Sequence, residues 1–355
     1  MSSTPGGPGA ARPGREGSLD APTRHPLQWR EAAFYDPAAL EKELERVFDI
    51  CHGCRRCFSL CNSFPTLFDA VDATSEGEVS ALDKTVFWEV VDHCYLCDMC
   101  FMTKCPYVPP HPWNVDFPHL MLRAKAVRAK GGGLKFAERV LAATDTVGNL
   151  AGIPVVAEVV NAVNASRPGR ALLEKTLGVD RTAPLPKYYA RSARRRLARL
   201  GTVHHEPAPP AAVRASPDTT GRVALFTTCY GNHNEPELDE DLVAVLEHNG
   251  IEVALLAAER CCGMPRLELG DLEGVAKLKE HNIPQLIAAI EAGYDLIAPI
   301  PSCVLMFKQE LPLMYAGDAQ VQRVARRIFD PFEYLMRRHA ADFALALAAL
   351  PAHRC

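Results

Sequence analysis

The sequence predicts an α + α/β protein, in which an all-helical domain is followed by a parallel-sheet α/β domain. Two observations predict this division. Eight of the 13 cysteines lie between Cys51 and Cys105, in segments flanked by amphipathic helical patterns. After residue 222, short apolar runs alternate with longer amphipathic ones, which is the pattern of a parallel sheet covered by helices. With 355 residues, 48% of them hydrophobic, the chain has the size and composition of two modest globular domains.

Residues 1–35 are predicted to be a disordered leader. The first 30 residues are rich in Pro, Gly, Ala and Arg, and they contain neither the apolar core of a signal peptide nor a twin arginine. No stretch approaches the apolar length needed to cross a bilayer. Clustered cysteines without an export signal favour metal binding over disulfides. We therefore expect a cytoplasmic protein, peripheral at most on the inner face of the cytoplasmic membrane.

A net charge of −4 gives the chain no overall basic field, so no nucleic-acid partner is expected.

The helical domain is predicted to span residues 36–130. The run 37–48 has an amphipathic helical pattern and leads into the first cysteine segment. A second helix-like run covers 85–93. A third covers 117–130 and is stopped by three successive glycines. These helices would hold the two cysteine segments in place.

Two cysteine segments of this domain have the spacing of iron–sulfur ligands. Residues 51–61 read CHGCRRCFSLC, and residues 94–106 read CYLCDMCFMTKCP. Three thiolates at two-residue gaps can bind three irons of one cubane, while the fourth ligand comes from the other segment. The first 4Fe–4S cluster is therefore assigned to Cys51, Cys54, Cys57 and Cys105. The second is assigned to Cys94, Cys97, Cys100 and Cys61. The domain is thus predicted to be a helical ferredoxin-like domain with two cubane clusters.

A pair of zinc sites is the main alternative, because CxxC pairs also suit tetrahedral zinc. Zinc has no use for a third cysteine at the same spacing and a fourth at a fixed offset, repeated twice. The segments depart from the usual ferredoxin pattern in two places. Asn62 stands where a proline normally follows, and four residues rather than three precede Cys105.

Residues 131–221 are predicted to be a helical connector and linker. Apolar residues recur at roughly helical spacing through 134–163, interrupted by two glycines and a proline. These helices either pack on their own domain or dock on a partner subunit or a membrane surface. The basic run 191–199 is interpreted as a solvated helix face or as a contact for anionic lipid. The Pro-rich stretch 203–221 predicts the linker.

The α/β domain is predicted to span residues 222–345, with strands near 223–227, 252–256 and 296–300. Cysteines lie at or just after the carboxyl end of each strand: Cys229, the adjacent pair Cys261 and Cys262, and Cys303. The carboxyl ends of parallel strands form the binding crevice of an open sheet, so these four thiols are expected to converge. We favour a third iron–sulfur centre there. A redox-active disulfide and buried core cysteines are the alternatives.

With these motifs in place, the chain resembles the heterodisulfide reductase and glycolate oxidase iron–sulfur subunit superfamily. The ferredoxin segments are followed by a C-x31-CCG-x39-C pattern, and the stretches CYGNHNEPEL, ERCCGMP and LPKY match as well. The resemblance implies a cysteine-rich CCG domain after the ferredoxin domain. It also implies that electrons pass from a flavin-containing dehydrogenase or reductase subunit towards a quinone or another carrier.

The sequence departs from that superfamily in two ways. Members commonly carry two CCG domains, whereas this sequence shows one complete copy. Met306 stands where the fullest motif has its last cysteine.

Three functional hypotheses follow. The first is an electron-transfer subunit rather than a stand-alone catalyst, since no flavin or nicotinamide fingerprint is present. The second is a catalytic heterodisulfide or thiol–disulfide reductase that uses the cysteines of the α/β domain. The third is a non-redox iron–sulfur sensor or scaffold.

Overall fold

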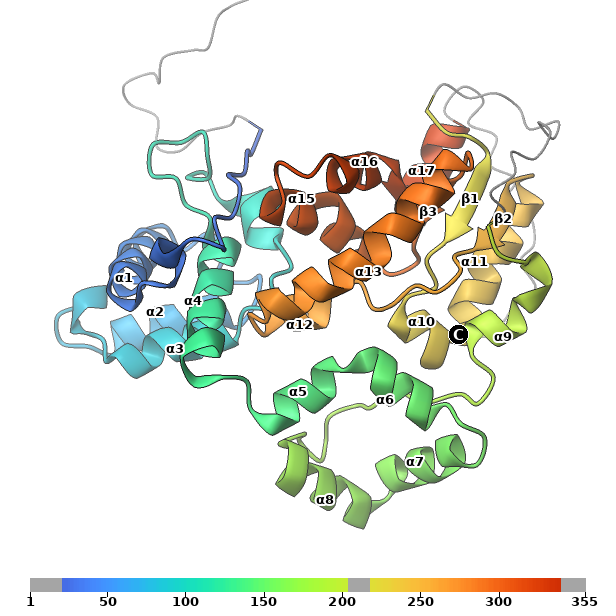
Figure 1. Ribbon diagram of the computed structural model, residues 1–355. Coiled ribbons are helices and arrows are strands. Elements are labelled where there is room, and N and C mark those ends of the chain that lie inside the picture. Colours follow the sequence, from blue (N-terminus) through green and yellow to red (C-terminus); the bar gives the residue numbers. More distant parts are fainter. Residues whose placement is uncertain (1–20, 204–217, 340–355) are drawn as a thin grey trace, which may run out of the picture. The chain divides into compact units, whose positions relative to one another are not determined.

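The structure is a computed structural model that describes residues 21–203 and 218–339 (Figure 1). It forms two compact units, Met1–Gly131 and Gly132–Cys355. The first unit is helical and the second contains a parallel sheet, which confirms the predicted α + α/β class. The beginning of the predicted leader, most of the predicted linker and Cys355 lie outside the described residues.

Unit 1 is built around phenylalanines that its helices bring together. These helices are α1 (Pro37–Cys54), α2 (Ser63–Asp72), α3 (Lys84–Asp92) and α4 (Phe117–Gly132). The rings of Phe48 and Phe87 lie 5.0 Å apart, and those of Phe64 and Phe117 lie 4.8 Å apart. Burying each such side chain stabilises the unit by about 1.5–3 kcal/mol. This core carries the two cysteine segments on its edge.

Part of the predicted leader is ordered in the structure. Residues Ala32–Tyr35 form a short 3₁₀ helix, and the Trp29 side chain is only 2% exposed. Asp36 then caps α1, because its carboxylate accepts hydrogen bonds from the backbone N–H groups of Ala38 and Ala39. Residues 21–35 therefore belong to the packed unit, and the prediction of a disordered leader is wrong for this part of residues 1–35.

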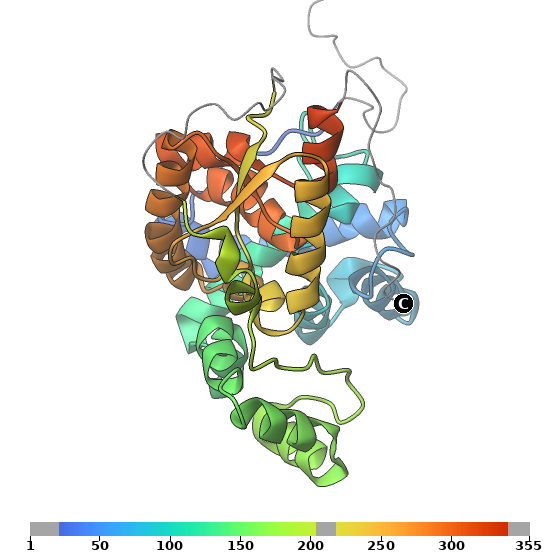
Figure 2. The same ribbon diagram turned by 90° about the vertical axis from the view of Figure 1, so that its right-hand side faces the viewer.

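Unit 2 contains a four-stranded parallel sheet in the order β2-β1-β3-β4. The strands are β1 (Arg222–Leu225), β2 (Glu252–Leu255), β3 (Asp295–Ile297) and β4 (Ile328–Phe329). The first three were predicted; the two-residue β4 was not. Helices α11 (Pro236–His248) and α13 (Leu272–Glu291) lie on opposite faces of the sheet (Figure 2). This arrangement follows from two right-handed crossovers that run in opposite directions along the sheet: α11 connects β1 to β2, and α13 connects β2 to β3 past β1.

Short helices follow the strands at the carboxyl edge of the sheet. They are α10 (Cys229–His233), α12 (Met264–Glu268) and α14 (Pro301–Leu305). Three more helices come later in the chain: α15 (Leu311–Met314), α16 (Ala319–Arg327) and α17 (Pro331–Arg338). The strand-to-helix turns thus set the positions of the cysteines in unit 2.

The connector forms helices that belong to unit 2. They are α5 (Phe136–Ala142), α6 (Thr144–Ala151), α7 (Val156–Ala165) and α8 (Arg167–Leu177). Gly148 lets α6 approach α10 closely, since a Cβ at that position would lie 2.4 Å from the His233 ring. No single helix in the described ranges is both long and apolar enough to span a membrane. The bent pair α6 and α7 reaches that length and composition only when the two are taken together, across a 106° bend.

The basic run is occupied by ion pairs inside unit 2. Helix α9 (Ala193–Arg196) lies in this run. Arg194 pairs with Glu259 just after β2, whereas Arg196 and Arg199 pair with carboxylates on α11. These ion pairs attach the connector to the α/β core. The sequence had suggested only a solvated helix face or a contact for anionic lipid.

Candidate metal centres

The first predicted ligand set lines one cavity in unit 1. Cys51, Cys54, Cys57 and Cys105 line the same small cavity, of about 20 Å³. Cys51 and Cys54 lie in the last turn of α1, and Cys57 follows in the next turn of the chain. Burial raises the pKa of the Cys51 thiol well above its ordinary value, and the charges of Cys105, Cys57 and Cys54 raise it further. Four thiols around one cavity, three of which raise the pKa of Cys51 by their charges, suit a cationic centre.

The second predicted set is also brought together across the two segments. Burial raises the pKa of Cys94 to about 12, and the neighbouring charges of Cys61 and Cys97 add to that rise. Burial likewise raises the pKa of Cys100, with further contributions from Cys94 and then from Cys57. Because Cys57 belongs to the first set and Cys94 to the second, the two sets adjoin.

Both cysteine segments contain residues in the left-handed region of backbone conformation. Arg55 ends α1 at φ 53°, and Leu96 and Asp98 have φ values of 52° and 63°. Each such residue costs about 1–3 kcal/mol, so the surrounding structure must hold it in place. These turns reverse the chain between consecutive cysteines and direct their thiols to one side.

The extra residue before Cys105 is absorbed by a π-helical turn, Cys100–Lys104. The backbone N–H of Cys105 donates to the Cys100 carbonyl at 2.9 Å, five residues back rather than four. The departure from the ferredoxin pattern is thus a local widening of one turn, and Cys105 still reaches the first cavity.

An arginine from the predicted leader fastens the second cysteine segment. The Arg24 guanidinium donates to Asp98 at 2.6 Å and to Asp116 at 3.0 Å, and it lies 4.3 Å from the Phe101 ring centre. The Arg24 and Asp98 side chains are 7% and 4% exposed. Burial acts to raise the pKa of Asp116, but its bonds with His119 and Arg24 outweigh burial and lower it. Sequence patterns gave no sign of this role for Arg24.

Within the described ranges, no set of three or more Cys, His, Asp or Glu side chains is arranged to hold one metal ion. That finding applies to the binding of a single metal ion and not to the binding of a cluster. The thiolates of a cubane bind different irons and therefore stand farther apart than the ligands of one zinc ion.

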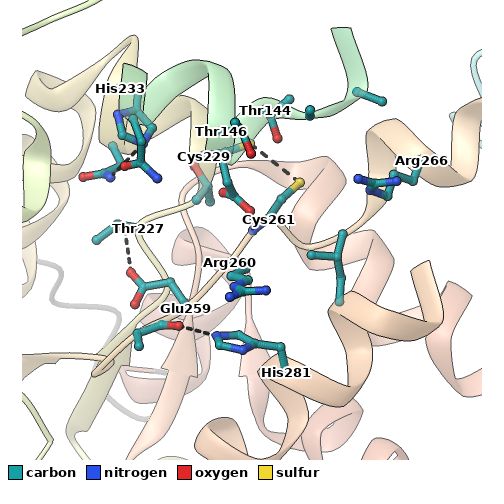
Figure 3. A pocket seen from close by; sticks show the side chains of 18 of the residues that line it. Thr144, Thr146, Thr227, Cys229, His233, Glu259, Arg260, Cys261, Arg266 and His281 are labelled. Atoms are coloured by element: carbon teal, nitrogen blue, oxygen red, sulfur yellow. Dashed lines mark hydrogen bonds between the residues drawn. The ribbon is translucent and has the colours of Figure 1, made fainter. Parts of the chain in front are cut away.

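The four cysteines of unit 2 converge at the carboxyl edge of the sheet. The Sγ atoms of Cys229 and Cys261 lie 3.8 Å apart (Figure 3). The Cys262 thiol is within hydrogen-bonding reach of both Cys261 and Cys303. The predicted gathering of these thiols is therefore present.

Electrostatics within this group favours one thiolate. The thiols of Cys229 and Cys262 donate to Cys261, which lowers the pKa of Cys261 despite its burial. The same bonds raise the pKa values of Cys229 and Cys262, because donation requires their protons. The group therefore concentrates negative charge at Cys261.

The backbone at Cys261 is held from α13 by the buried Asn282. Its side-chain Oδ1 accepts from the Arg260 N–H at 2.9 Å, and its Nδ2 donates to the carbonyls of Arg260 and Cys261 at 3.1 and 3.0 Å. On the other side of the loop, Glu259 accepts from Thr227 at 2.7 Å and pairs with Arg194. The loop after β2 is thus fixed at several successive residues.

Helix α6 of the connector contributes two residues that sequence reasoning missed. Asp145 accepts a hydrogen bond from the Cys261 backbone N–H at 2.8 Å. The buried Thr144 hydroxyl lies beside the thiols of Cys229 and Cys261 and favours the thiolate form of each. It adds to the lowering of the Cys261 pKa and opposes the net rise in the Cys229 pKa.

Gly263 and Met306 close the back of the thiol group. Gly263 has φ 105°, a conformation that side chains strongly disfavour, as its place after two cysteines predicts. A Cβ there would lie 3.5 Å from the Met306 side chain, which is fully buried. The methionine that replaces the last cysteine of the motif therefore packs beside the site.

A cavity of about 560 Å³ opens beside Cys229 and Cys261. Its other lining side chains are mostly polar, and they include Arg260, Arg266 and His281 (Figure 3). Cys229 and Cys261 thus face a polar chamber.

The part of unit 2 that contains the four clustered cysteines matches a known family. Residues 223–308 match the family described as a cysteine-rich domain, CCG. The match confirms the resemblance indicated by the sequence motifs, and it covers the described strands β1 to β3 together with all four clustered thiols.

Curated relatives extend the comparison. The chain is 31% identical over 174 residues to the C subunit of anaerobic glycerol-3-phosphate dehydrogenase from Escherichia coli, covering 49% of this chain and 40% of the relative. It is 35% identical over 109 residues to lactate utilization protein A of Macrococcus caseolyticus, covering 31% and 42%. The chain thus spans less than half the length of these relatives. No solved structure matches it.

Proposed function

We propose that this chain is an iron–sulfur electron-transfer subunit of an oxidoreductase. The observation that carries the proposal is the shared cavity of Cys51, Cys54, Cys57 and Cys105, in which a cysteine of the second segment completes the set of the first. This cross-segment arrangement is what two neighbouring cubanes require and what two separate zinc sites do not.

The residues of unit 1 would hold two 4Fe–4S clusters, the first on the cavity cysteines and the second on Cys94, Cys97, Cys100 and Cys61. When bound, such clusters supply reversible one-electron transfer. The chain's own contribution is to exclude water and to fix the thiols. Burial of Cys51 and Cys94 gives a dry environment, and Lys125 donates to the Cys94 carbonyl, where its charge also offsets negative charge.

The partner is proposed to be a flavin-containing dehydrogenase or reductase subunit, with a quinone or another carrier on the other side. One relative is named as part of a dehydrogenase, which supports a role inside a larger complex. Exposed apolar side chains on the connector support a contact with that partner or with a membrane surface. Among them, Leu150 is 60% exposed and Val155 is 68% exposed.

In the CCG domain, we favour a third iron–sulfur centre on Cys229, Cys261, Cys262 and Cys303. The concentration of negative charge at Cys261 supports a bound cationic group. A redox-active disulfide is the alternative, since the 3.8 Å between the sulfurs of Cys229 and Cys261 is short enough to close with a small movement.

Iron and sulfide quantitation with low-temperature EPR, on anaerobically purified protein, tests the proposal. We expect about eight irons per chain from unit 1, and more if the CCG centre is present. Stoichiometric zinc with no iron after anaerobic purification would refute it.

A catalytic thiol–disulfide reductase is the second candidate, favoured by the polar 560 Å³ cavity beside Cys229 and Cys261. A disulfide substrate there would take two electrons and two protons from Cys229 and Cys261, which would close into a disulfide, and it would leave as two thiols. Reductase activity that is lost in Cys229→Ser would favour this candidate. Electron transfer between added donor and acceptor dyes that survives the substitution would favour the first.

A further inference from the structure

A second cavity of unit 2 shares no lining residue with the cysteine cavity. It lies between α7, α8 and residues 181–187 and has a volume of about 650 Å³. Four of its lining side chains are cationic: Arg167, Arg170, Arg181 and Lys187. No acidic side chain lines it in the described part of the chain. The cavity is therefore strongly positive for its size.

Arg170 is the central cation of this cavity and is 91% buried, at a relative exposure of 9%. Its Nε donates to the Arg181 carbonyl at 3.0 Å, and one terminal nitrogen donates to the carbonyls of Asp180 and Ala183. The other terminal nitrogen, Nη1, is buried and has no partner among the described residues. A buried guanidinium with an unsatisfied donor is costly unless another group accepts its hydrogen bond.

Nearby carboxylates neutralise this charge only in part. Glu174 pairs with Arg181 outside the cavity, and Asp180 accepts from the backbone and hydroxyl of Thr182 while lying close enough to Arg170 to feel its charge. Arg167 and Lys187 form no ion pair with any residue that the structure describes. An excess of positive charge therefore remains around the cavity.

We propose that this cavity binds a phosphate group. Guanidinium groups present paired donors that match phosphate oxygens, and a buried arginine flanked by further cations is a characteristic phosphate environment. The Asn164 amide, which also lines the cavity, supplies a neutral donor. Arg167 stands at the start of the 11-residue helix α8, where the helix dipole adds to the positive potential.

The phosphate could come from a soluble phosphate ester or from a phospholipid headgroup, since both present the same oxygens. Val159 and Val163 of α7 are 56% and 40% exposed, so the same helix also offers apolar side chains to an acyl region. A phospholipid has acyl chains and is presented in a membrane, whereas a phosphate ester is in solution. An experiment can therefore separate the two sources.

The test uses the full chain, purified anaerobically, with two probes. Inorganic phosphate is titrated by calorimetry. Vesicles of phosphatidylcholine, with and without phosphatidylglycerol, are tested by co-sedimentation. The main variant is Arg167→Ala combined with Lys187→Ala, because both side chains are exposed and their loss spares the fold. Lys175→Ala is the matched control, since Lys175 is an exposed cation of α8 that does not line the cavity.

We expect the double variant to weaken binding by about tenfold or more, because each cation contributes about 1 kcal/mol to attraction of an anionic group. Lys175→Ala should leave binding unchanged. Arg170→Lys keeps the positive charge but loses the paired N–H donors of the guanidinium group, so it should also weaken binding. Circular dichroism checks that it folds.

The outcomes distinguish the sources. Phosphate binding without vesicle binding indicates a soluble ester, whereas binding to phosphatidylglycerol vesicles that inorganic phosphate competes away indicates a headgroup. The proposal is overturned if neither probe binds, or if Lys175→Ala weakens binding as much as the double variant does.

Discussion

Unit 1 gathers its cysteines by short turns of the chain, whereas unit 2 gathers them by the order of its strands. In unit 1 the thiols of each segment lie a few residues apart, and left-handed residues such as Leu96 reverse the chain between them. In unit 2 the thiols come from residues 229, 261, 262 and 303, at the ends of three strands. The first site depends on local backbone geometry, and the second depends on the whole α/β core.

The two sites should therefore fail differently. Damage to one turn of unit 1 should affect one ligand set and leave the core intact. Damage to the support of one loop in unit 2 should spread, because that loop is fixed by residues that follow β1 and by residues of α6 and α13.

The largest expected effect is on the ligand sets of unit 1. Cys97→Ser should destroy or convert the second cluster and leave the first largely intact, so that about four of about eight irons are lost. Iron analysis and EPR measure this. Cys303→Ser is the control, since it should leave both clusters of unit 1 unchanged. If Cys97→Ser removes all iron from a domain that is still folded, the assignment of ligands across the two segments is wrong.

The next effect concerns the anchor of the second cysteine segment. Arg24→Met leaves the buried Asp98 without its arginine, which should destabilise unit 1 by about 3–5 kcal/mol. The denaturant midpoint for loss of cluster absorbance should fall accordingly.

Arg46→Met is its matched control. Arg46 pairs with Glu43 on the surface, where both side chains are more than a third exposed, so its loss should cost at most about 1 kcal/mol. Equal effects of the two substitutions would show that residues 21–35 do not hold unit 1 together.

A smaller effect is expected in unit 2. Asn282→Ala leaves two carbonyls and one N–H of the loop after β2 unpaired, which should cost about 1–3 kcal/mol. Thermal unfolding of unit 2 should shift down while the EPR of unit 1 stays unchanged. Asn249→Ala removes a single bond to the Val245 carbonyl and should shift unfolding less. A matching loss of unit 1 signal would mean that the two units do not unfold separately.

The smallest effect tests the contribution of α6 to the CCG site. Hydrogen bonds to sulfur stabilise the reduced, more negative state of a thiolate-bound or disulfide centre. Thr144→Val should therefore lower the reduction potential of that centre by about 20–60 mV, equivalent to about 0.5–1.5 kcal/mol. Thr146→Val, in the same cavity, is the control. An unchanged potential in Thr144→Val would assign Thr144 to packing only.

The features that the sequence predicts are those that depend on residues close to one another in the chain. The cysteine spacing of 51–61 and 94–105 predicts that Cys105 of the second segment lies beside the cysteines of the first, and the structure has this arrangement. The assignment of these residues as cluster ligands stays a prediction. The short apolar runs predict β1, β2 and β3. With two residues, β4 is too short to show any pattern.

The parts that could not be predicted depend on contacts between distant residues. Arg24 lies in a stretch whose composition indicates disorder, and only the buried Asp98, 74 residues later, gives it a role. Thr144 and Asp145 begin a helix that looked like a connector. Their place beside Cys261 follows from close packing of α6 on α10 at Gly148, which no local pattern encodes.

The widened turn between Cys100 and Cys105 shows how this loop accommodates an additional residue. An inserted residue is accommodated within a single turn, so its effect does not propagate into the neighbouring helices or shift the register of the core. Met102 projects outwards at 48% exposure, whereas its neighbour Phe101 is buried. We therefore expect a change of one residue at the outward-facing position of this turn to alter the turn alone and to leave the cysteines on either side in place.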